Sequence, residues 1–206
     1  MARPQRFDTN QLLDAAVRLA AAAGPAAVTM SAVATEVGAP SGSVYHRFPR
    51  RTALLAEVWL RTVESFQQGY LETIEARADA REAGCAAARQ VVAWSRAHPR
   101  EAALLLYGAQ DFARAEWSQE HIQRADRGNR RVHAALASLA AALGADGPQA
   151  TERAVLAMVD LPLSLVRRHL RAGDPLPAHA EDLAEECTAA LLGSLPMAPS
   201  VSGSRH

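Results

Sequence analysis

The stretch GAPSGSVYHRFPRRTALL, residues 38–55, gathers hydroxyl, imidazole and guanidinium groups and contains no acidic residue. In a helix, Ser43, His46 and Arg47 share one face, because positions three and four residues apart lie side by side. A guanidinium group can donate two hydrogen bonds to guanine, a serine hydroxyl can donate or accept, and a tyrosine hydroxyl suits a phosphate oxygen. These residue types at this spacing indicate recognition of nucleic acid.

Three short helices are predicted to position these side chains. The first covers residues 9–23, where apolar residues recur at helical spacing after Asp8 and Thr9, two candidate N-caps. The second begins at the cap Thr29 and ends at Gly38, which can take the left-handed conformation that closes a helix. The third covers about residues 40–48 and buries Val44 and Phe48. A short helix, a glycine turn and a helix with a cationic outer face form a helix-turn-helix arrangement.

The remainder of the chain also reads as helical. Alanine dominates the apolar residues and aromatics are only 5% of the chain, which favours an all-α fold. A long helix is predicted from Arg51 to about Ala78, and Pro162 is expected to kink a later one. Asp160, close to the kink expected at Pro162, is either a polar group of a pocket or, as we prefer, a cap for backbone amides that the kink frees. The other predicted helices are 82–97, 99–107, 112–143, 149–171 and 178–194, so about nine helices are expected in all.

Charge and composition limit the classes of function that the protein can have. The 22 basic residues are all arginine and balance 22 acidic ones, but residues 1–51 hold six arginines against three acidic residues. Cys85 and Cys187 lack the spacing of a metal site, and no metal or cofactor is expected. No apolar run approaches the length of a membrane span, so we expect a cytoplasmic protein. The sequence contains no GxGxxG, P-loop, HExxH or GxSxG motif, so we expect no enzyme.

The segment MSAVATEVGAPSGSVYHRFPRRTALL, residues 30–55, resembles the signature of the TetR family of bacterial transcriptional repressors. In that signature, a helix ending in glycine precedes a Ser/Thr-rich recognition helix that closes with tyrosine, a variable pair and phenylalanine. The family usually has lysine where this chain has Arg51, which keeps the positive charge. Arg3 and Arg6 leave two alternatives open, an arm that reaches DNA or an untethered terminus. The resemblance implies that Ser41, Ser43, His46 and Arg47 face base edges, while Thr29, Tyr45 and Arg51 hold phosphates.

The resemblance also implies a division of labour along the chain. Residues 1–51 would form the DNA-binding domain, residues 52–195 an effector-binding and dimerisation domain, and residues 196–206 a disordered tail. The family encloses its effector in this second domain, although for each candidate residue core packing is the alternative. The candidates are the aromatic residues and one histidine of this region: Phe66, Tyr70, Trp94, Tyr107, Phe112, Trp117 and His121.

The last two predicted helices carry one-sided apolar stripes, and the family dimerises through these helices. The stripes are Ala154, Met158, Leu161 and Leu165 on the first helix, and Leu183, Cys187, Ala190 and Leu191 on the second. Together with these stripes, the resemblance therefore implies a homodimeric, ligand-responsive repressor that binds a palindromic DNA operator. The alternative is an all-helical small-molecule carrier or enzyme with a vestigial helix-turn-helix.

Overall fold

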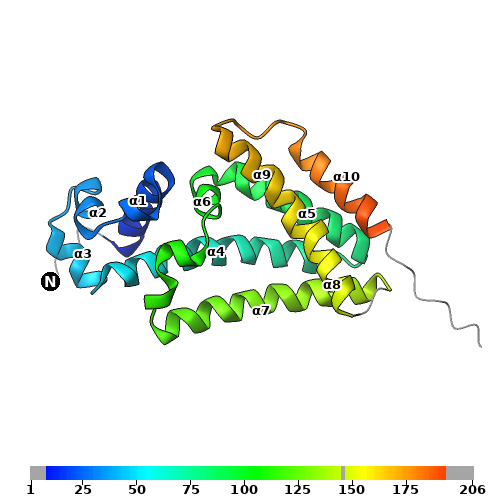
Figure 1. Cartoon of the computed structure of the whole chain (residues 1–206), viewed down its shortest axis with the longest axis horizontal. Helices are drawn as coiled ribbons and strands as arrows, with labels where there is room; N and C mark the ends of the chain where they lie inside the picture. Colours follow the sequence, from blue (N-terminus) through cyan, green and yellow to red (C-terminus); the bar gives the residue numbers. More distant parts are fainter. Residues whose placement is uncertain (1–7, 145–146, 194–206) are drawn as a thin grey trace, which may run out of the picture. The chain divides into compact units, whose positions relative to one another are not determined.

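A computed structural model of the chain describes residues 8–144 and 147–193, and these residues form helices and no strand (Figure 1). The helices are α1 (Thr9–Ala23), α2 (Met30–Glu36), α3 (Ser41–Arg47), α4 (Arg51–Glu75), α5 (Ala80–Ala97), α6 (Pro99–Leu104), α7 (Gln119–Ala142), α8 (Pro148–Val155), α9 (Leu161–Ala172) and α10 (Ala180–Gly193). Because α8 and α9 are joined without a break by a π-helical turn, Leu156–Asp160, the described residues contain nine continuous α-helical segments. The predicted all-α class is confirmed. Arg3, Arg6 and the predicted tail lie outside the described residues.

The chain packs as two compact units. Unit 1 comprises Met1–Gln67 and Ser95–Asn129, and unit 2 comprises Gln68–Trp94 and Arg130–His206. Helices α4, α5 and α7 therefore contribute residues to both units. The predicted boundary after residue 51 is a division by function and stays a prediction. The packing of unit 1 reaches further along the chain, because Leu104, Phe112 and Trp117 join the same apolar cluster as α1 to α3.

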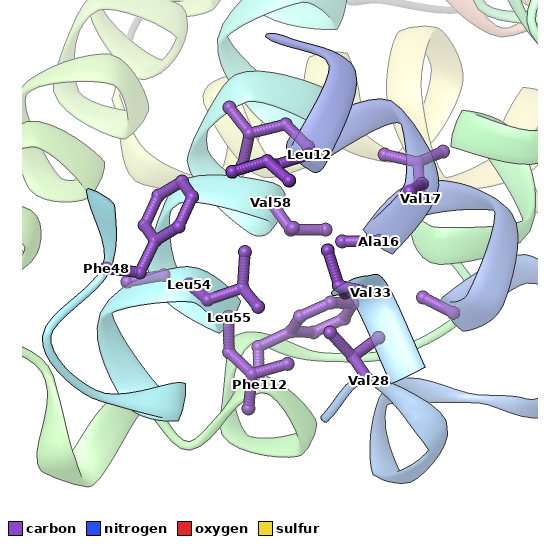
Figure 2. Close-up of a cluster of buried hydrophobic side chains, with 14 of the residues drawn as sticks. Leu12, Ala16, Val17, Val28, Val33, Phe48, Leu54, Leu55, Val58 and Phe112 are labelled. Carbon is purple, nitrogen blue, oxygen red and sulfur yellow. The ribbon is translucent and has the colours of Figure 1, made fainter. Parts of the chain in front are cut away.

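One apolar core holds the three short helices of unit 1 against the start of α4. The side chain of Asp8 caps α1 in a capping box with Gln11, and Thr29 caps α2, as predicted. Figure 2 shows side chains from α1, α2, α4 and the Phe112 segment converging on this core. The residues labelled there are Leu12, Ala16, Val17, Val28, Val33, Phe48, Leu54, Leu55, Val58 and Phe112.

The predicted helix over residues 112–143 is wrong at its start, since α7 begins only at Gln119. Two 3-10 turns, Ala109–Phe112 and Arg114–Glu116, precede it. Between them Ala113 takes the left-handed conformation, with φ of 58°, which interrupts a helix. The indole Nε1 of Trp117 donates to the carbonyl of Phe112 at 2.8 Å and holds this folded segment in place. Buried tertiary contacts thus override the helical pattern of the sequence.

In unit 2, a π-helical turn, Leu156–Asp160, lies directly before α9 and Pro162, while the kink expected at Pro162 stays a prediction. Proline lacks an N–H group, and the N–H of Leu161 donates to Leu156 O, so the carbonyl of Ala157 loses its usual helical donor. The hydroxyl of Thr188 on α10 donates to Ala157 O at 2.8 Å instead. The expectation that Asp160 caps freed amides is wrong, because the freed groups are carbonyls and the Asp160 side chain is exposed.

The neighbouring carbonyl, that of Met158, accepts a hydrogen bond of 3.2 Å from the Tyr70 hydroxyl. This tyrosine is buried, and burial raises its pKa, so the hydroxyl stays protonated and donates. The buried hydroxyls of Tyr70 on α4 and Thr188 on α10 therefore donate hydrogen bonds to two carbonyl groups of the π-helical turn.

The substitution Thr188→Val should lower the free energy of unfolding by about 1–3 kcal/mol, because it leaves a buried carbonyl without a donor while conserving shape. Chemical denaturation measures the change. Thr151→Val is the matched control, since the Thr151 hydroxyl makes a long, exposed bond of 3.4 Å to Gly147 O. Equal losses in the two variants would show that Thr188 does not stabilise the turn.

Candidate nucleic-acid interface

Helices α2 and α3 form a helix-turn-helix whose turn depends on a glycine. Gly38 has φ of +66°, and its N–H donates to Thr35 O while the N–H of Ala39 donates to Ala34 O. Val44 on α3 and Phe48, the residue that follows this helix, are buried in the core of unit 1, as predicted. The opposite face of α3 is therefore available to a partner.

The exposed face of α3 carries Ser41, Tyr45 and His46. Tyr45 is 56% exposed, which is high for an aromatic residue beside an apolar core. Ser43 is half-buried at the edge of this face. At the start of α2, the exposed Thr29 hydroxyl accepts the N–H of Ala32 at 3.0 Å. The arrangement offers hydroxyl and imidazole groups to a ligand outside the protein.

Arg47, also predicted to face bases, lies elsewhere. Its Nη1 donates to the Thr9 hydroxyl at 2.9 Å, and the side chain is half-buried beside the first residue of α1. A contact between Arg47 and a base would require this side chain to leave Thr9.

Arg51, predicted to hold a phosphate, is bound to backbone carbonyls of the loop between α1 and α2. Its Nε donates to Val28 O at 2.6 Å, and its Nη2 donates to Pro25 O at 2.9 Å and to Ala26 O at 3.3 Å. These partners lie 23 to 26 residues away in the sequence, so local pattern gave no sign of them. In this structure Arg51 fixes the loop against the start of α4.

Arg51→Ala should therefore lower the free energy of unfolding by about 1.5–3 kcal/mol, the range for hydrogen bonds that involve a charged group. Thermal or urea unfolding measures this loss. Arg50→Ala is the adjacent control, because Arg50 is exposed. If both variants unfolded like the parent protein, the three carbonyl contacts would contribute nothing to stability.

The predicted effector residues are distributed over both packing units. Phe112 and Trp117 belong to the core of unit 1, and the ring centroid of Phe112 lies 5.0 Å from that of Trp59. Tyr107 is partly exposed and lies against Gly24. Phe66, half-buried, also belongs to unit 1. In unit 2, Tyr70 holds the carbonyl of Met158 and Trp94 is buried.

His121 belongs to a polar network between α4 and α7 within unit 1. Its Nε2 lies 3.0 Å from a carboxylate oxygen of Glu57, and its Nδ1 lies 2.8 Å from the Ser118 hydroxyl. Arg124 donates to Glu57 at 2.8 Å and makes two hydrogen bonds to Glu64. The hydrogen bonding with Glu64 raises the pKa of Arg124 further above its usual value. Glu57 thus has two basic partners.

Trp117 and His121 line a groove of about 760 Å³ in unit 1. The groove brings together the start of α1, the turn between α3 and α4, and the segment leading into α7. Its lining is Thr9, Leu13, Arg47, Phe48, Pro49, Arg50, Thr52, Ala53, Glu57, Glu116, Trp117, Ser118 and His121. Most of these residues were absent from the sequence-based prediction, because three distant segments form the groove only after folding.

Comparison with known proteins agrees with this geometry. The family model of bacterial regulatory proteins, tetR family, matches residues 12–58, which include α2 and α3. A search of curated proteins finds no significant match. In the described part of the chain, no helix is both long enough and apolar enough to cross a membrane.

Solved transcriptional regulators share the fold over nearly the whole chain. The regulator FadR from Bacillus subtilis, solved in complex with stearoyl-CoA, is 14% identical with a TM-score of 0.71, covering 92% of this chain and 100% of FadR. A regulator from Rhodococcus sp. Rha1 is 21% identical with a TM-score of 0.70, covering 92% and 96%. The ketosteroid regulator KstR2 of Mycobacterium tuberculosis is 18% identical with a TM-score of 0.70, covering 94% and 98%. Residues 12–58 therefore match a DNA-binding domain of the tetR family of bacterial regulatory proteins, and the chain shares the fold of these solved transcriptional regulators.

Proposed function

We propose that the protein is a ligand-responsive repressor that binds a palindromic DNA operator as a homodimer. The exposed face of α3, opposite the buried Val44 and Phe48, is the observation that carries this proposal. A helix of this kind enters the major groove, and a two-fold dimer matches a site with two-fold symmetry. Ser41, Ser43 and His46 would read base edges, while Thr29 and Tyr45 would hold phosphates.

The DNA contacts predicted for Arg47 and Arg51 must take account of the partners that both side chains already have within the protein. Arg47 reads a base after it exchanges its Thr9 partner for guanine. Arg51 adds positive charge near a phosphate while it keeps the loop carbonyls as partners. Arg51 then favours binding to every DNA sequence, whereas Arg47 favours particular ones.

Exposed apolar side chains on the last helices support the proposed homodimer. Leu161 on α9 is 39% exposed and Leu183 on α10 is 36% exposed. Cys187 and Ala190 are also exposed on α10. By contrast, Ala154 and Met158 of the predicted stripe are fully buried within unit 2, so they have no surface for a partner. A second copy would cover the exposed leucines.

The proposed effector is apolar or aromatic. Two regulators of similar fold are linked to ligands with a large apolar part: one was solved in complex with stearoyl-CoA, whose acyl chain is apolar although its CoA group is charged, and the other is called a ketosteroid regulator. An effector that prefers the conformation unable to bind DNA by about 1–3 kcal/mol would weaken operator binding roughly 5- to 150-fold. Repression would then be relieved as the effector accumulates.

A gel-shift assay with fragments of genomic DNA tests this proposal against the carrier or enzyme alternative, which needs no sequence-specific DNA. The parent protein should shift a few fragments, and His46→Ala should weaken that binding or change which fragments shift. His133→Ala is the matched control, because His133 is exposed on α7 and far along the chain from α3. If no fragment shifts selectively, the repressor proposal is wrong and the alternative gains support.

A further inference from the structure

The groove of unit 1 has the volume of a small-molecule site and a mixed lining of apolar and polar residues. Its volume of about 760 Å³ falls within the range of roughly 300–1,000 Å³ typical of ligand pockets. All its lining residues belong to unit 1, and Arg47, the last residue of α3, is one of them, so the groove lies beside this helix. Its apolar wall includes Leu13, Phe48 and Trp117, whose side chains are almost fully buried. Such a wall suits an aromatic or aliphatic group.

One end of the groove is cationic. Arg47 and Arg50 line it at the turn between α3 and α4, together with Thr52 and Ala53 in the first turn of α4. This helix is 25 residues long and has no acidic residue in its first turn. The N-terminus of a helix carries partial positive charge, and at the start of α4 the N–H groups of Ala53 and Leu54 already donate to Arg50 O. Two guanidinium groups and a helix N-terminus at one place favour an anion.

The acidic residues of the groove do not cancel this charge. Glu57 is already paired with His121, and Arg124, which lies outside the groove lining, donates to it at 2.8 Å. Glu116 is exposed, as Arg50 is, but it belongs to the segment before α7 and not to the turn between α3 and α4 that holds the two arginines. The cationic end therefore keeps its preference for a negative group.

We propose that this groove binds an amphipathic organic acid. The acidic group pairs with Arg50 and Arg47 at the start of α4, and the apolar body lies on Leu13, Phe48 and Trp117. An acid bound there also holds Arg47 inside the groove. This consequence for DNA binding rests on the proposed repressor function, in which Arg47 must leave Thr9 to reach a base.

Two fluorescent probes with the same aromatic skeleton test the site. 8-Anilinonaphthalene-1-sulfonate carries a sulfonate, and N-phenyl-1-naphthylamine lacks it. The parent protein should bind the sulfonate probe about tenfold more tightly, as expected for roughly one charge-assisted hydrogen-bonded pair. Arg50→Gln should remove most of that difference and leave the neutral probe unchanged. Arg100→Gln, an exposed arginine of α6 outside the groove, should change neither affinity.

A second variant locates the probes. Ala53→Leu places a larger side chain in the groove and should weaken both probes at least about tenfold. Ala86→Leu, at a half-buried position of α5 in unit 2, is the control. Equal binding of the two probes by the parent protein, or affinities that ignore Arg50→Gln, would overturn the proposal without involving DNA.

The effect on DNA is measured separately, with a fragment selected in the gel-shift assay. Saturation with the sulfonate probe should weaken binding of that fragment, and the fragment should weaken probe binding by the same factor. Independent binding of probe and fragment would contradict the coupling through Arg47. Failure to find any selected fragment would contradict the repressor function and leave the probe result standing.

Discussion

Replacing Leu161 and Leu183 together by glutamate should convert the protein from a dimer to a monomer in sedimentation. Both leucines are more than a third exposed, so the charges remain in water in the monomer and cost little there. In a dimer covered by the partner, they would be buried without a counter-charge, at a cost of several kcal/mol. Operator binding should fall with the dimer, because one half-site alone supplies only part of the contacts.

These two positions make a sharper test than the predicted stripe as a whole. Leu165 packs against a buried cluster within unit 2, so Leu165→Glu would destabilise the monomer as well. Circular dichroism and thermal unfolding of the double variant check that the fold is kept. Glu substitutions at two exposed positions, Ala76 just after α4 and Ala97 at the end of α5, control for the added charge. A double variant that stays dimeric would place the interface on another surface.

Phe112→Ala should lower the free energy of unfolding by about 3–5 kcal/mol, the range for removing a buried aromatic ring. The ring is fully buried in the core that also holds Leu12, Val28 and Val33, and it lies 5.0 Å from the ring of Trp59. Urea unfolding measures the loss. DNA binding should weaken as well, because this core positions the three helices of the DNA-binding domain.

The same variant separates the two interpretations of Phe112. Tyr107→Ala, which removes a partly exposed ring from a neighbouring segment, should cost much less stability. If Phe112 serves the effector rather than the core, its removal would leave stability near that of the parent and weaken only the response to ligand. A loss below about 1 kcal/mol would support that second role.

Local signals in the sequence account for much of the helix-turn-helix. The caps Asp8 and Thr29, the left-handed Gly38 and the buried pair Val44 and Phe48 all follow from residue type and spacing. Each depends on groups within about one helical turn. Because such features depend on interactions between residues close in sequence, they can be predicted from the sequence alone.

The structure adds what depends on distant groups. From the sequence alone, Arg51 is expected to be a surface cation. In the structure it donates hydrogen bonds to the carbonyls of Pro25 and Val28. The pairing of Glu57 with His121 joins residues 64 positions apart, and the Tyr70 bond to Met158 O joins residues 88 apart. No local pattern encodes these contacts. For the same reason, the groove beside α3 could not be predicted from the sequence.

The most direct test of the account is selection of bound fragments from random double-stranded DNA. The parent protein should enrich an inverted repeat whose half-site centres lie about 34–36 Å apart, or a multiple of that spacing, because two recognition helices of a symmetric dimer must meet the major groove on one side of the duplex. His46→Ala should lose preference at one base position of each half-site, at about 1–3 kcal/mol per position. A selected pool without any shared inverted repeat would contradict the claim that α3 reads DNA in a dimeric repressor.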